Sequence, residues 1–555
     1  MRIGLLTEGG YPYATGESRL WCDRLVRGLA QHEFDVYALS RSARQEEGGW
    51  VSLPPQVRQV RTAALWAPED DGHTYGRRER RRFVAHFRQL AAAVCTEGDA
   101  PEFAEGLYGL AELARECGGL YAALRSELAV RALESACRAP GARRTVQGAA
   151  VPDHLAFVDG LERALRPLSL DWYGEDALGA VDLSHAASGG SAALPGLLAK
   201  RFCGVPLLVT EYGVQLRAHY LSAREAGLGA PVRALLAAFH GRLAAEVYRQ
   251  ASVITPGNTH ARRWQEKCGA DRAKLRTVYP GMEADRFAAL GDGAGGRGGD
   301  PHTLVWVGRI EPAKDLVALL HALAEIRKED PQARLRILGA PVVGPESATY
   351  LAHCRALAAQ LFPDEAADAH AVGDNPVSFE EIGAPEAPEL VDAYAAGEVI
   401  VLSSVVEGFP ISLVEAMFCG RATVSTDVGA VVEVIGGTGL VVPPRNPRAL
   451  ADACLALLRD PERRERLGAA ARARALELFT VEQNLAAFRG IYLELISYSP
   501  VQREAESVDA DGEPRPFAYP VESHVPGRWP GPATTPSWAD GTGPGMVPTA
   551  EEAGR

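Results

Sequence analysis

Two short apolar segments, one near the start of each half of the chain, constrain the fold more than any other feature. The first runs from Arg2 to Thr7 and is followed by Glu8-Gly9-Gly10; the second runs from Thr303 to Val307 and is followed by Gly308-Arg309. Each is followed in turn by a stretch with helical spacing. A strand, a glycine turn and a helix in succession are typical of parallel α/β domains. The sequence therefore predicts two Rossmann-like domains, and 555 residues also exceed one ordinary core.

Changes in composition along the chain suggest where the domains begin and end. An Ala-, Leu- and Arg-rich stretch with few strand signals predicts a helical insertion, and the run GDGAGGRGG predicts a linker. The last residues are rich in proline and lack periodicity, which is typical of disorder. The predicted order is an N-terminal Rossmann-like domain (1–290) with a helical insertion (75–165), a linker (291–299), a C-terminal Rossmann-like domain (300–479), a closing helix (480–496) and a disordered tail (497–555). We expect the closing helix to pack on the first domain.

Charge and cysteine usage exclude several classes of protein. The net charge of -13 argues against a general nucleic-acid binder, which needs a basic surface. The nine cysteines contain no CxxC pair, so neither a zinc site nor a disulfide framework is expected. No signal peptide and no apolar run long enough to span a membrane is evident. We therefore expect a cytoplasmic protein.

The segment GRIEPAKD, residues 308–315, has the composition of a phosphate-binding turn. Gly308 ends a predicted strand and lets a ligand approach the backbone, and Arg309 and Lys314 place two cations around a helix start. A diphosphate is bound by such an arrangement of backbone N–H groups, a helix N-terminus and fixed positive charge. From these residues alone, two surface cations without a ligand remain an equal alternative.

A second candidate segment, SSVVEGFPISLVEAMFCG, spans residues 403–420 and carries two glutamates. Glu407 lies in a loop after a buried strand, and Glu415 lies on the helix that Pro410 begins. Ligands of parallel α/β folds bind at the carboxyl ends of strands. Glu407 is therefore a candidate for sugar hydroxyls and Glu415 for ribose hydroxyls. The alternative is a solvated helix carboxylate, and it applies more to Glu415 than to Glu407.

These two segments, read together with the first half of the chain, resemble a known family. GRIEPAKD followed by EGFPISLVEAMFCGRATVSTDVGA is similar to the donor-binding half of family 4 glycosyltransferases, the retaining enzymes of the GT-B fold. EGGYPYATGESRLWCDRLVRGL, DLSHAASGG and VTEYGVQLRAHY resemble the PelF-like subgroup. The resemblance implies an α/β GT-B fold in which two Rossmann-like domains face each other across a cleft.

The resemblance also implies roles for individual residues. Arg309 and Lys314 would hold the donor diphosphate, Glu407 would contact the transferred sugar and Glu415 the ribose. His185 would lie near the sugar and the reacting centre, although a satisfied core histidine is the alternative reading of that position. The remaining residues that the resemblance places at the substrate are Gly9, Gly10, Glu211, Gly308, Gly408 and Phe409. Two departures from the subgroup, Glu17 and Tyr212, lie on the acceptor-facing side.

The implied reaction is transfer of a hexose or N-acetylhexosamine from a nucleotide diphosphate sugar, UDP-linked in the subgroup, to a glycan or other hydroxyl acceptor in polysaccharide biosynthesis. The anomeric configuration would be retained, and no metal would be needed because Arg309 and Lys314 would replace it. Metal-dependent glycosyltransferases hold their cation with a DxD sequence; the only DxD in this chain, Asp509-Ala510-Asp511, lies in the predicted tail, where we interpret it as a chance occurrence. Peripheral association with a membrane export complex is left open. Two alternatives also stay open: a nucleotide-sugar 2-epimerase of the same fold, and a non-catalytic nucleotide-sugar-binding subunit, motivated by Glu17 and Tyr212.

Overall fold

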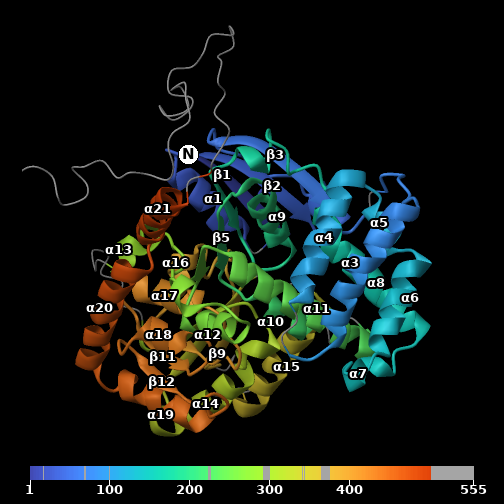
Figure 1. Cartoon of the computed structure of the whole chain (residues 1–555). Helices are drawn as coiled ribbons and strands as arrows, with labels where there is room; N and C mark the ends of the chain where they lie inside the picture. Colours follow the sequence, from blue (N-terminus) through green and yellow to red (C-terminus); the bar gives the residue numbers. More distant parts are fainter. Residues whose placement is uncertain are drawn as a thin grey trace, which may run out of the picture. The chain divides into compact units, whose positions relative to one another are not determined.

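The computed structural model describes residues 1–501 except residues 17, 68–69, 99–100, 223–226, 292–299, 341, 343, 364–374 and 500. Residues 292–299 of the predicted linker, nearly all of the predicted tail, Glu17 and the DxD sequence thus lie outside the described residues. The described part contains two six-stranded sheets in which every pair of neighbouring strands is parallel. Figure 1 shows their elements in chain order.

The first sheet has the order β3-β2-β1-β4-β5-β6. Its strands are β1 (Arg2–Glu8), β2 (Glu33–Ser40), β3 (Val57–Ala64), β4 (Leu183–Ala186), β5 (Leu207–Glu211) and β6 (Val253–Pro256). The central strand β1 is apolar almost throughout because helices cover both faces of a parallel sheet. Between these strands, apart from the predicted insertion, lie α1 (Arg19–Gly28), α2 (Ala43–Glu47), α9 (Leu194–Cys203), α10 (Gln215–Ser222) and α11 (Ala230–Gln250), and α12 (Thr259–Lys267) follows β6.

The second sheet has the order β12-β11-β10-β7-β8-β9. Its strands are β7 (Asp300–Gly308), β8 (Arg334–Gly339), β9 (Val377–Glu381), β10 (Gly397–Leu402), β11 (Ala422–Thr426) and β12 (Leu440–Val442). The α-helices of this half up to the last one are α13 (Ala288–Gly291), α14 (Leu316–Glu329), α15 (Pro345–Leu361), α16 (Leu390–Ala395), α17 (Ile411–Phe418), α18 (Val431–Ile435), α19 (Pro447–Leu458) and α20 (Pro461–Leu478).

Both sheets reverse their strand order at one place. In the first sheet the chain proceeds from β1 to one side through β2 and β3 and to the other side through β4, β5 and β6. In the second sheet the same reversal separates β7 from β10. Ligands of open parallel sheets bind at the carboxyl ends of the strands beside such a reversal. The topology therefore directs attention to the loops that follow β1 and β4, and to those that follow β7 and β10.

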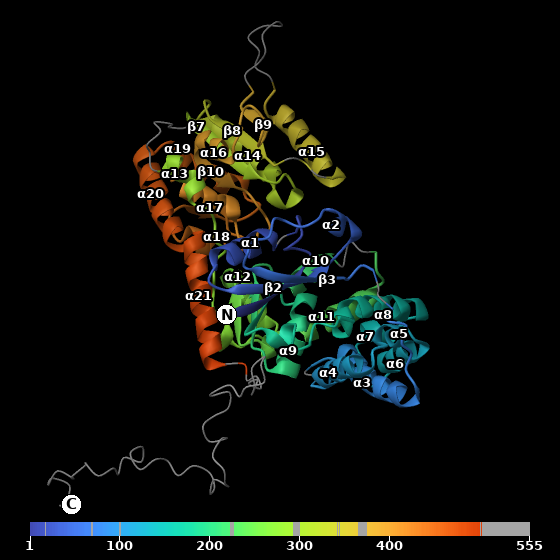
Figure 2. The ribbon, with the colours of Figure 1, turned by 90° about the horizontal axis from the view of Figure 1, so that it is seen from above.

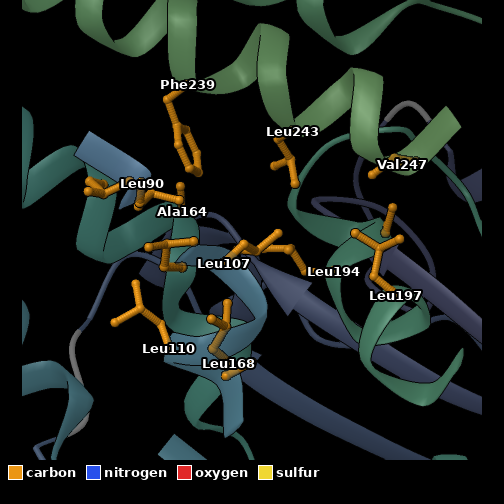
Figure 3. Close-up of a cluster of buried hydrophobic side chains, with 14 of the residues drawn as sticks. Leu90, Leu107, Leu110, Ala164, Leu168, Leu194, Leu197, Phe239, Leu243 and Val247 are labelled. Atoms are coloured by element: carbon orange, nitrogen blue, oxygen red, sulfur yellow. The ribbon is translucent and has the colours of Figure 1, made fainter. Parts of the chain in front are cut away.

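The predicted insertion, residues 75–165, holds the helices α3 (Arg77–Cys95), α4 (Glu102–Cys117), α5 (Leu120–Leu124), α6 (Glu127–Cys137), α7 (Arg144–Gln147) and α8 (Val151–Leu165). They gather at one end of the first sheet in both views (Figures 1 and 2). Their apolar side chains form one core with α9 and α11, in which Phe239, Leu243 and Val247 of α11 lie over Leu107 and Leu110 of α4 and over residues of α9 (Figure 3). The insertion thus extends the core of the first domain.

The closing helix is α21 (Val481–Tyr498), which packs on the first sheet. Phe488, Tyr492 and Leu495 belong to the same apolar cluster as Ile3 and Leu5 of β1. A Cβ atom on Gly28 of α1 would meet the side chain of Leu485 at 2.2 Å, so α1 and α21 approach closely. This is the packing expected from the sequence, and it ties the end of the second half to the beginning of the chain.

Candidate functional site

The loops that follow β7 and β10 are joined by hydrogen bonds. The backbone N–H of Val405 donates to the carbonyl of Ala313 at 2.9 Å, and the hydroxyl of Ser403 donates to the carbonyl of Lys314 at 2.8 Å. Gly308 ends β7, and its carbonyl accepts from the N–H of Ala340 at 3.0 Å. Since β7 and β10 are neighbours, the two segments singled out in the sequence lie side by side.

Lys314 and Glu407 form an ion pair at this edge of the sheet. The Nζ atom of Lys314 lies 2.5 Å from Oε1 of Glu407, and the two side chains are 15% and 9% exposed. The Ser404 hydroxyl donates to the same carboxylate oxygen at 2.7 Å. A charge pair this far from water is held in one geometry because either charge alone would be poorly solvated. Two of the charged groups assigned to the donor from the sequence, Lys314 and Glu407, are thus brought together, and they neutralise each other.

Arg309, the other predicted cation, has a different environment. Its side chain is 79% exposed, and its guanidinium lies 3.9 Å from a carboxylate oxygen of Glu311. An exposed ion pair at that distance contributes little stability. The Arg309 side chain can therefore turn toward an anion at small cost, whereas Lys314 must share or leave Glu407 to do so.

Glu415 lies on α17, and its carboxylate accepts a hydrogen bond from the Tyr394 hydroxyl of α16 at 2.6 Å. Burial raises the pKa of Glu415 above its ordinary value, although the Tyr394 hydrogen bond opposes that rise. Tyr394 is fully buried. Glu415 is therefore not the solvated helix carboxylate that the sequence left open, and Tyr394, which sequence reasoning missed, fixes its orientation.

Gly408 and Phe409 shape the loop that carries Glu407. The Gly408 carbonyl accepts from the N–H of Ala430 at 3.1 Å, which fastens the loop to the segment before α18. The Phe409 ring packs 5.7 Å from the ring of Phe479 and 6.4 Å from that of Tyr279, measured between centroids. In this structure Phe409 is thus an anchor of the loop, and contact of either residue with a ligand stays a prediction.

Gly9 and Gly10 form the turn after β1. Gly9 has a φ of 65°, a left-handed conformation that favours glycine. A Cβ atom on Gly10 would lie 1.9 Å from the Ser18 hydroxyl oxygen, so a larger residue would require the Ser18 side chain to move. The two glycines therefore allow a tight turn at the reversal of the first sheet, and their contact with substrate stays a prediction.

His185 of β4 is fully buried within the first domain. Its Nδ1 atom lies 2.7 Å from the Tyr492 hydroxyl of α21, and its Nε2 atom lies 2.6 Å from the hydroxyl of Thr210. Burial lowers the pKa of His185 to about 3, so the ring is neutral at physiological pH. Both ring nitrogens have protein partners, which is the arrangement of a satisfied core histidine. The geometry favours that alternative over the catalytic role implied by the resemblance.

Glu211, at the end of β5, is likewise 1% exposed. It accepts from the N–H of Gly189 at 3.0 Å and of Gln215 at 3.1 Å, and from Gln265 at 3.1 Å. The Tyr248 hydroxyl donates to it at 2.5 Å. The resemblance places Glu211 at the substrate, but in this structure protein donors occupy its buried carboxylate, which thereby holds the loops after β4 and β5 in place.

Tyr212, one of the two departures from the subgroup, also serves the packing of the first domain. Its hydroxyl accepts from the Asn484 amide of α21 at 2.9 Å, and its ring lies 5.3 Å from that of Trp21.

Across residues 1–501, outside the gaps given above, His, Cys, Asp and Glu side chains form no group of three suited to a metal ion. None of the helices described combines the length and apolar character that crossing a membrane requires.

Two family matches divide the chain. Residues 301–460 match the family described as Glycosyl transferases group 1, and residues 1–273 match a domain of unknown function (DUF3492). The D-inositol 3-phosphate glycosyltransferase of Streptomyces bingchenggensis is 33% identical over 236 residues, covering 41% of this chain and 49% of the relative. That of Frankia alni is 37% identical over 215 residues, covering 37% and 50%. The chain thus spans about half the length of the curated relatives it matches.

Solved structures show the same fold at low sequence identity. Anabaena HepE in complex with UDP aligns with a TM-score of 0.53 and 15% identity, over 89% of this chain and all of that chain. Sucrose-phosphate synthase from Thermosynechococcus elongatus aligns with a TM-score of 0.53 and 17% identity, over 90% of this chain and all of that chain. The predicted GT-B fold is confirmed. Residues 301–460, within the second domain, are similar to the group 1 glycosyltransferases.

Proposed function

We propose that the chain transfers a hexose or N-acetylhexosamine from a UDP-sugar to a hydroxyl group of a glycan, with retention of configuration and without a metal ion. The observation that carries the proposal is the largely buried ion pair of Lys314 and Glu407 at the reversal of the second sheet. It puts a cation suited to a diphosphate beside a carboxylate suited to sugar hydroxyls. HepE, whose fold this chain shares, has been crystallised with UDP, which supports uridine as the base.

In the proposed reaction, the bond between the anomeric carbon and the diphosphate oxygen breaks, and its electron pair goes to that oxygen. The acceptor hydroxyl forms its bond to the same face of the carbon, and its proton passes to the leaving diphosphate. Arg309 and Lys314 would stabilise the negative charge that develops there. Glu407 would orient the sugar without bonding to it covalently, and Glu415 would accept hydrogen bonds from the ribose hydroxyls.

The PelF-like sequence features of the first half favour a growing polysaccharide as acceptor within this proposal. The match of residues 1–273 to a domain of unknown function is compatible with that acceptor and with others. Incubation with UDP-sugar alone, followed by NMR, distinguishes sugar transfer from epimerisation. If the UDP-sugar is epimerised, the protein is a nucleotide-sugar 2-epimerase and our proposal is wrong. Tight donor binding without turnover of any acceptor would indicate a non-catalytic subunit.

The nucleotide assignment is tested by calorimetric titration of UDP into wild type and Arg309→Ala. We expect UDP affinity to fall about ten-fold, because a charge-assisted contact to phosphate contributes about 1.5–3 kcal/mol. Arg448→Ala is the matched control, since Arg448 is an exposed arginine of α19 in the same domain. Equal UDP affinities in all three proteins would remove Arg309 from the site. The anomeric configuration of the product, read from NMR coupling constants, tests retention.

A further inference from the structure

A glutamate of the second domain lies against the start of a helix of the first. Glu433 is on α18, and its Oε2 atom accepts from the backbone N–H of Thr259 at 2.7 Å and from the Thr259 hydroxyl at 2.6 Å. Thr259 begins α12, and α18 and α12 lie next to each other in both views (Figures 1 and 2). The first N–H groups of a helix lack partners within it, and a carboxylate there is favourable. Glu433 thus connects the two domains directly.

The other oxygen of the same carboxylate engages Tyr279, which lies in the segment between β6 of the first sheet and β7 of the second. The Tyr279 hydroxyl donates to Oε1 of Glu433 at 2.8 Å. The backbone of Tyr279 is fastened to the first domain, because its carbonyl accepts from the Asn484 amide of α21 at 2.7 Å. Both oxygens of Glu433 therefore have partners that are held by the first domain.

The start of α18 packs on the loop that carries Glu407. Just before the helix, the N–H of Ala430 donates to the carbonyl of Gly408 at 3.1 Å. Gly429 lies so close to this loop that a Cβ atom there would meet the Glu407 carbonyl oxygen at 2.4 Å. Close packing transmits a displacement, because the neighbouring groups have no free space to absorb it. A shift of α18 would therefore move the loop.

Tyr279 supports the same loop through its ring. The centroid of that ring lies 6.4 Å from the centroid of Phe409, in the loop, and 5.0 Å from that of Phe479, at the end of α20. The loop is thus held by two groups, the start of α18 and the ring of Tyr279, and each of them is connected to Glu433.

The backbone of α18 is fixed within the second domain. Arg474 of α20 donates from Nη2 to the carbonyl of Glu433 at 2.7 Å and from Nε to that of Val434 at 2.9 Å. Carbonyl groups at the end of a short helix lack partners within it, so these two contacts stabilise α18. The backbone of Glu433 is therefore held by its own domain while its side chain reaches the other.

Resting on the proposed function, we propose that Glu433 is a positioning residue for sugar transfer, which holds the loop that carries Glu407 in register with the first domain. Glu407 orients the sugar in the proposed reaction, and transfer requires the donor and the acceptor to be aligned closely. Glu433 itself contacts neither the nucleotide nor the sugar. Thr259 is exposed and Glu433 is half-buried, so water can replace their hydrogen bonds at small cost and the contact can open.

The first test separates turnover from nucleotide binding. In Glu433→Ala we expect the kcat of sugar transfer to fall about five-fold, the change in rate that one lost hydrogen bond gives. The Kd of UDP, measured by calorimetry, should stay within about two-fold of the wild-type value, because UDP binds to the second domain alone. Glu462→Ala is the matched control, since Glu462 is an exposed glutamate of α20 in the same domain.

Conservative variants separate the contact from a general effect on folding. Glu433→Gln should retain most of the turnover, because its amide oxygen can accept from Thr259 and its amide nitrogen can donate to the Tyr279 hydroxyl. Tyr279→Phe keeps the ring beside Phe409 and removes only the hydroxyl, so kcat should fall in the same direction as in Glu433→Ala but less. Thr259→Val removes the hydroxyl donor and keeps the N–H, and we expect the same smaller loss.

Hydrogen exchange followed by mass spectrometry tests the connection without any turnover. In Glu433→Ala, peptides that cover the first turn of α12 and peptides that cover the loop carrying Glu407 should both exchange several-fold faster than in the wild type, because each loses a support. Both sets of peptides should exchange at the wild-type rate in Glu462→Ala.

Three results would overturn the proposal: unchanged exchange at the start of α12, faster exchange there with no change in the loop that carries Glu407, or a UDP affinity that falls in parallel with turnover. The last result would assign Glu433 to nucleotide binding. If the wild type transfers no sugar while Glu433→Ala still exchanges faster at both places, the proposed function is wrong and the connection through Glu433 stands.

Discussion

Glu407→Gln should strengthen UDP binding, whereas Lys314→Met should weaken it. In the structure the Lys314 ammonium is engaged by Glu407, so a diphosphate must share that cation or take it over. A charge-assisted hydrogen bond contributes about 1.5–3 kcal/mol and a neutral one about 0.5–1.5 kcal/mol. Replacing the carboxylate by an amide therefore frees about 1 kcal/mol for the nucleotide, or about five-fold in Kd. Lys314→Met removes the cation itself and should weaken UDP binding ten-fold or more.

The same pair predicts a pattern of stability. Lys314→Met leaves a carboxylate that is 9% exposed and, among the residues that the structure describes, keeps the Ser404 hydroxyl as its donor, so we expect a loss of about 3–5 kcal/mol in the free energy of unfolding. The double variant Lys314→Met, Glu407→Gln should recover much of that loss, because no buried charge remains. Lys328→Met is the control, since Lys328 pairs with Glu325 on the exposed face of α14 and such pairs contribute under about 1 kcal/mol.

Calorimetry with UDP and urea unfolding of each variant give the two readouts. The argument fails if Glu407→Gln weakens UDP binding as much as Lys314→Met does, because the carboxylate would then assist the nucleotide instead of competing for Lys314. It also fails if the double variant is no more stable than Lys314→Met alone. Turnover of UDP-sugar should fall in Glu407→Gln despite the tighter product, because the sugar loses its orienting carboxylate.

Three further predictions concern other parts of the structure. Glu415→Gln and Tyr394→Phe should both weaken UDP binding, as measured by calorimetry. Burial raises the pKa of Glu415, so the stability that its protonated form contributes is lost as pH rises through that raised pKa. Glu415→Gln should remove this pH dependence from the free energy of unfolding in urea. Burial lowers the pKa of His185 from 6.5 to about 3, so the protein loses stability as pH falls below about 6.5, by about 1.4 kcal/mol at pH 5.5. The free energy of unfolding of His185→Gln should therefore depend less on pH. An unchanged pH dependence would contradict the burial of His185 as a neutral ring. EDTA should leave turnover of UDP-sugar intact, and a loss restored by magnesium or manganese would show that Arg309 and Lys314 do not suffice.

The sequence predicts central strands better than edge strands. The segments that form β1 and β7 are recognisable because strands buried on both faces are nearly continuous apolar runs. β3, with the sequence VRQVRTAA, lies at the edge and is buried at only one position. β12 has three residues. Such strands are defined by the neighbour they pair with, and that neighbour is distant in sequence, so local patterning gives little signal.

The site residues also differ in how well the sequence predicts their surroundings, for a related reason. A glutamate after a buried strand could be assigned to a ligand from the sequence, because strand ends are where parallel folds bind ligands. Its pairing with Lys314 could not, because that depends on β10 lying next to β7. The burial of Glu211 depends in the same way on donors from separate segments, among them Tyr248 and Gln265. Lateral strand order and long-range packing are what a single sequence leaves undetermined.

The two sheet reversals each hold a cation paired with a carboxylate, and this likeness bears on where a diphosphate can bind. The reversal of the second sheet holds Lys314 beside Glu407, with the exposed Arg309 nearby in sequence, so it can supply positive charge to a diphosphate once Glu407 shares the lysine. The reversal of the first sheet holds Arg41 beside Glu8 in the same way, and the Arg41 side chain is 51% exposed. Replacing the carboxylate of this first pair by a cation, in Glu8→Lys, should therefore make the first reversal compete with the second for UDP, and calorimetry on the variant should then show a second binding event; a single, unchanged binding event would contradict the argument that paired charge decides where the diphosphate binds.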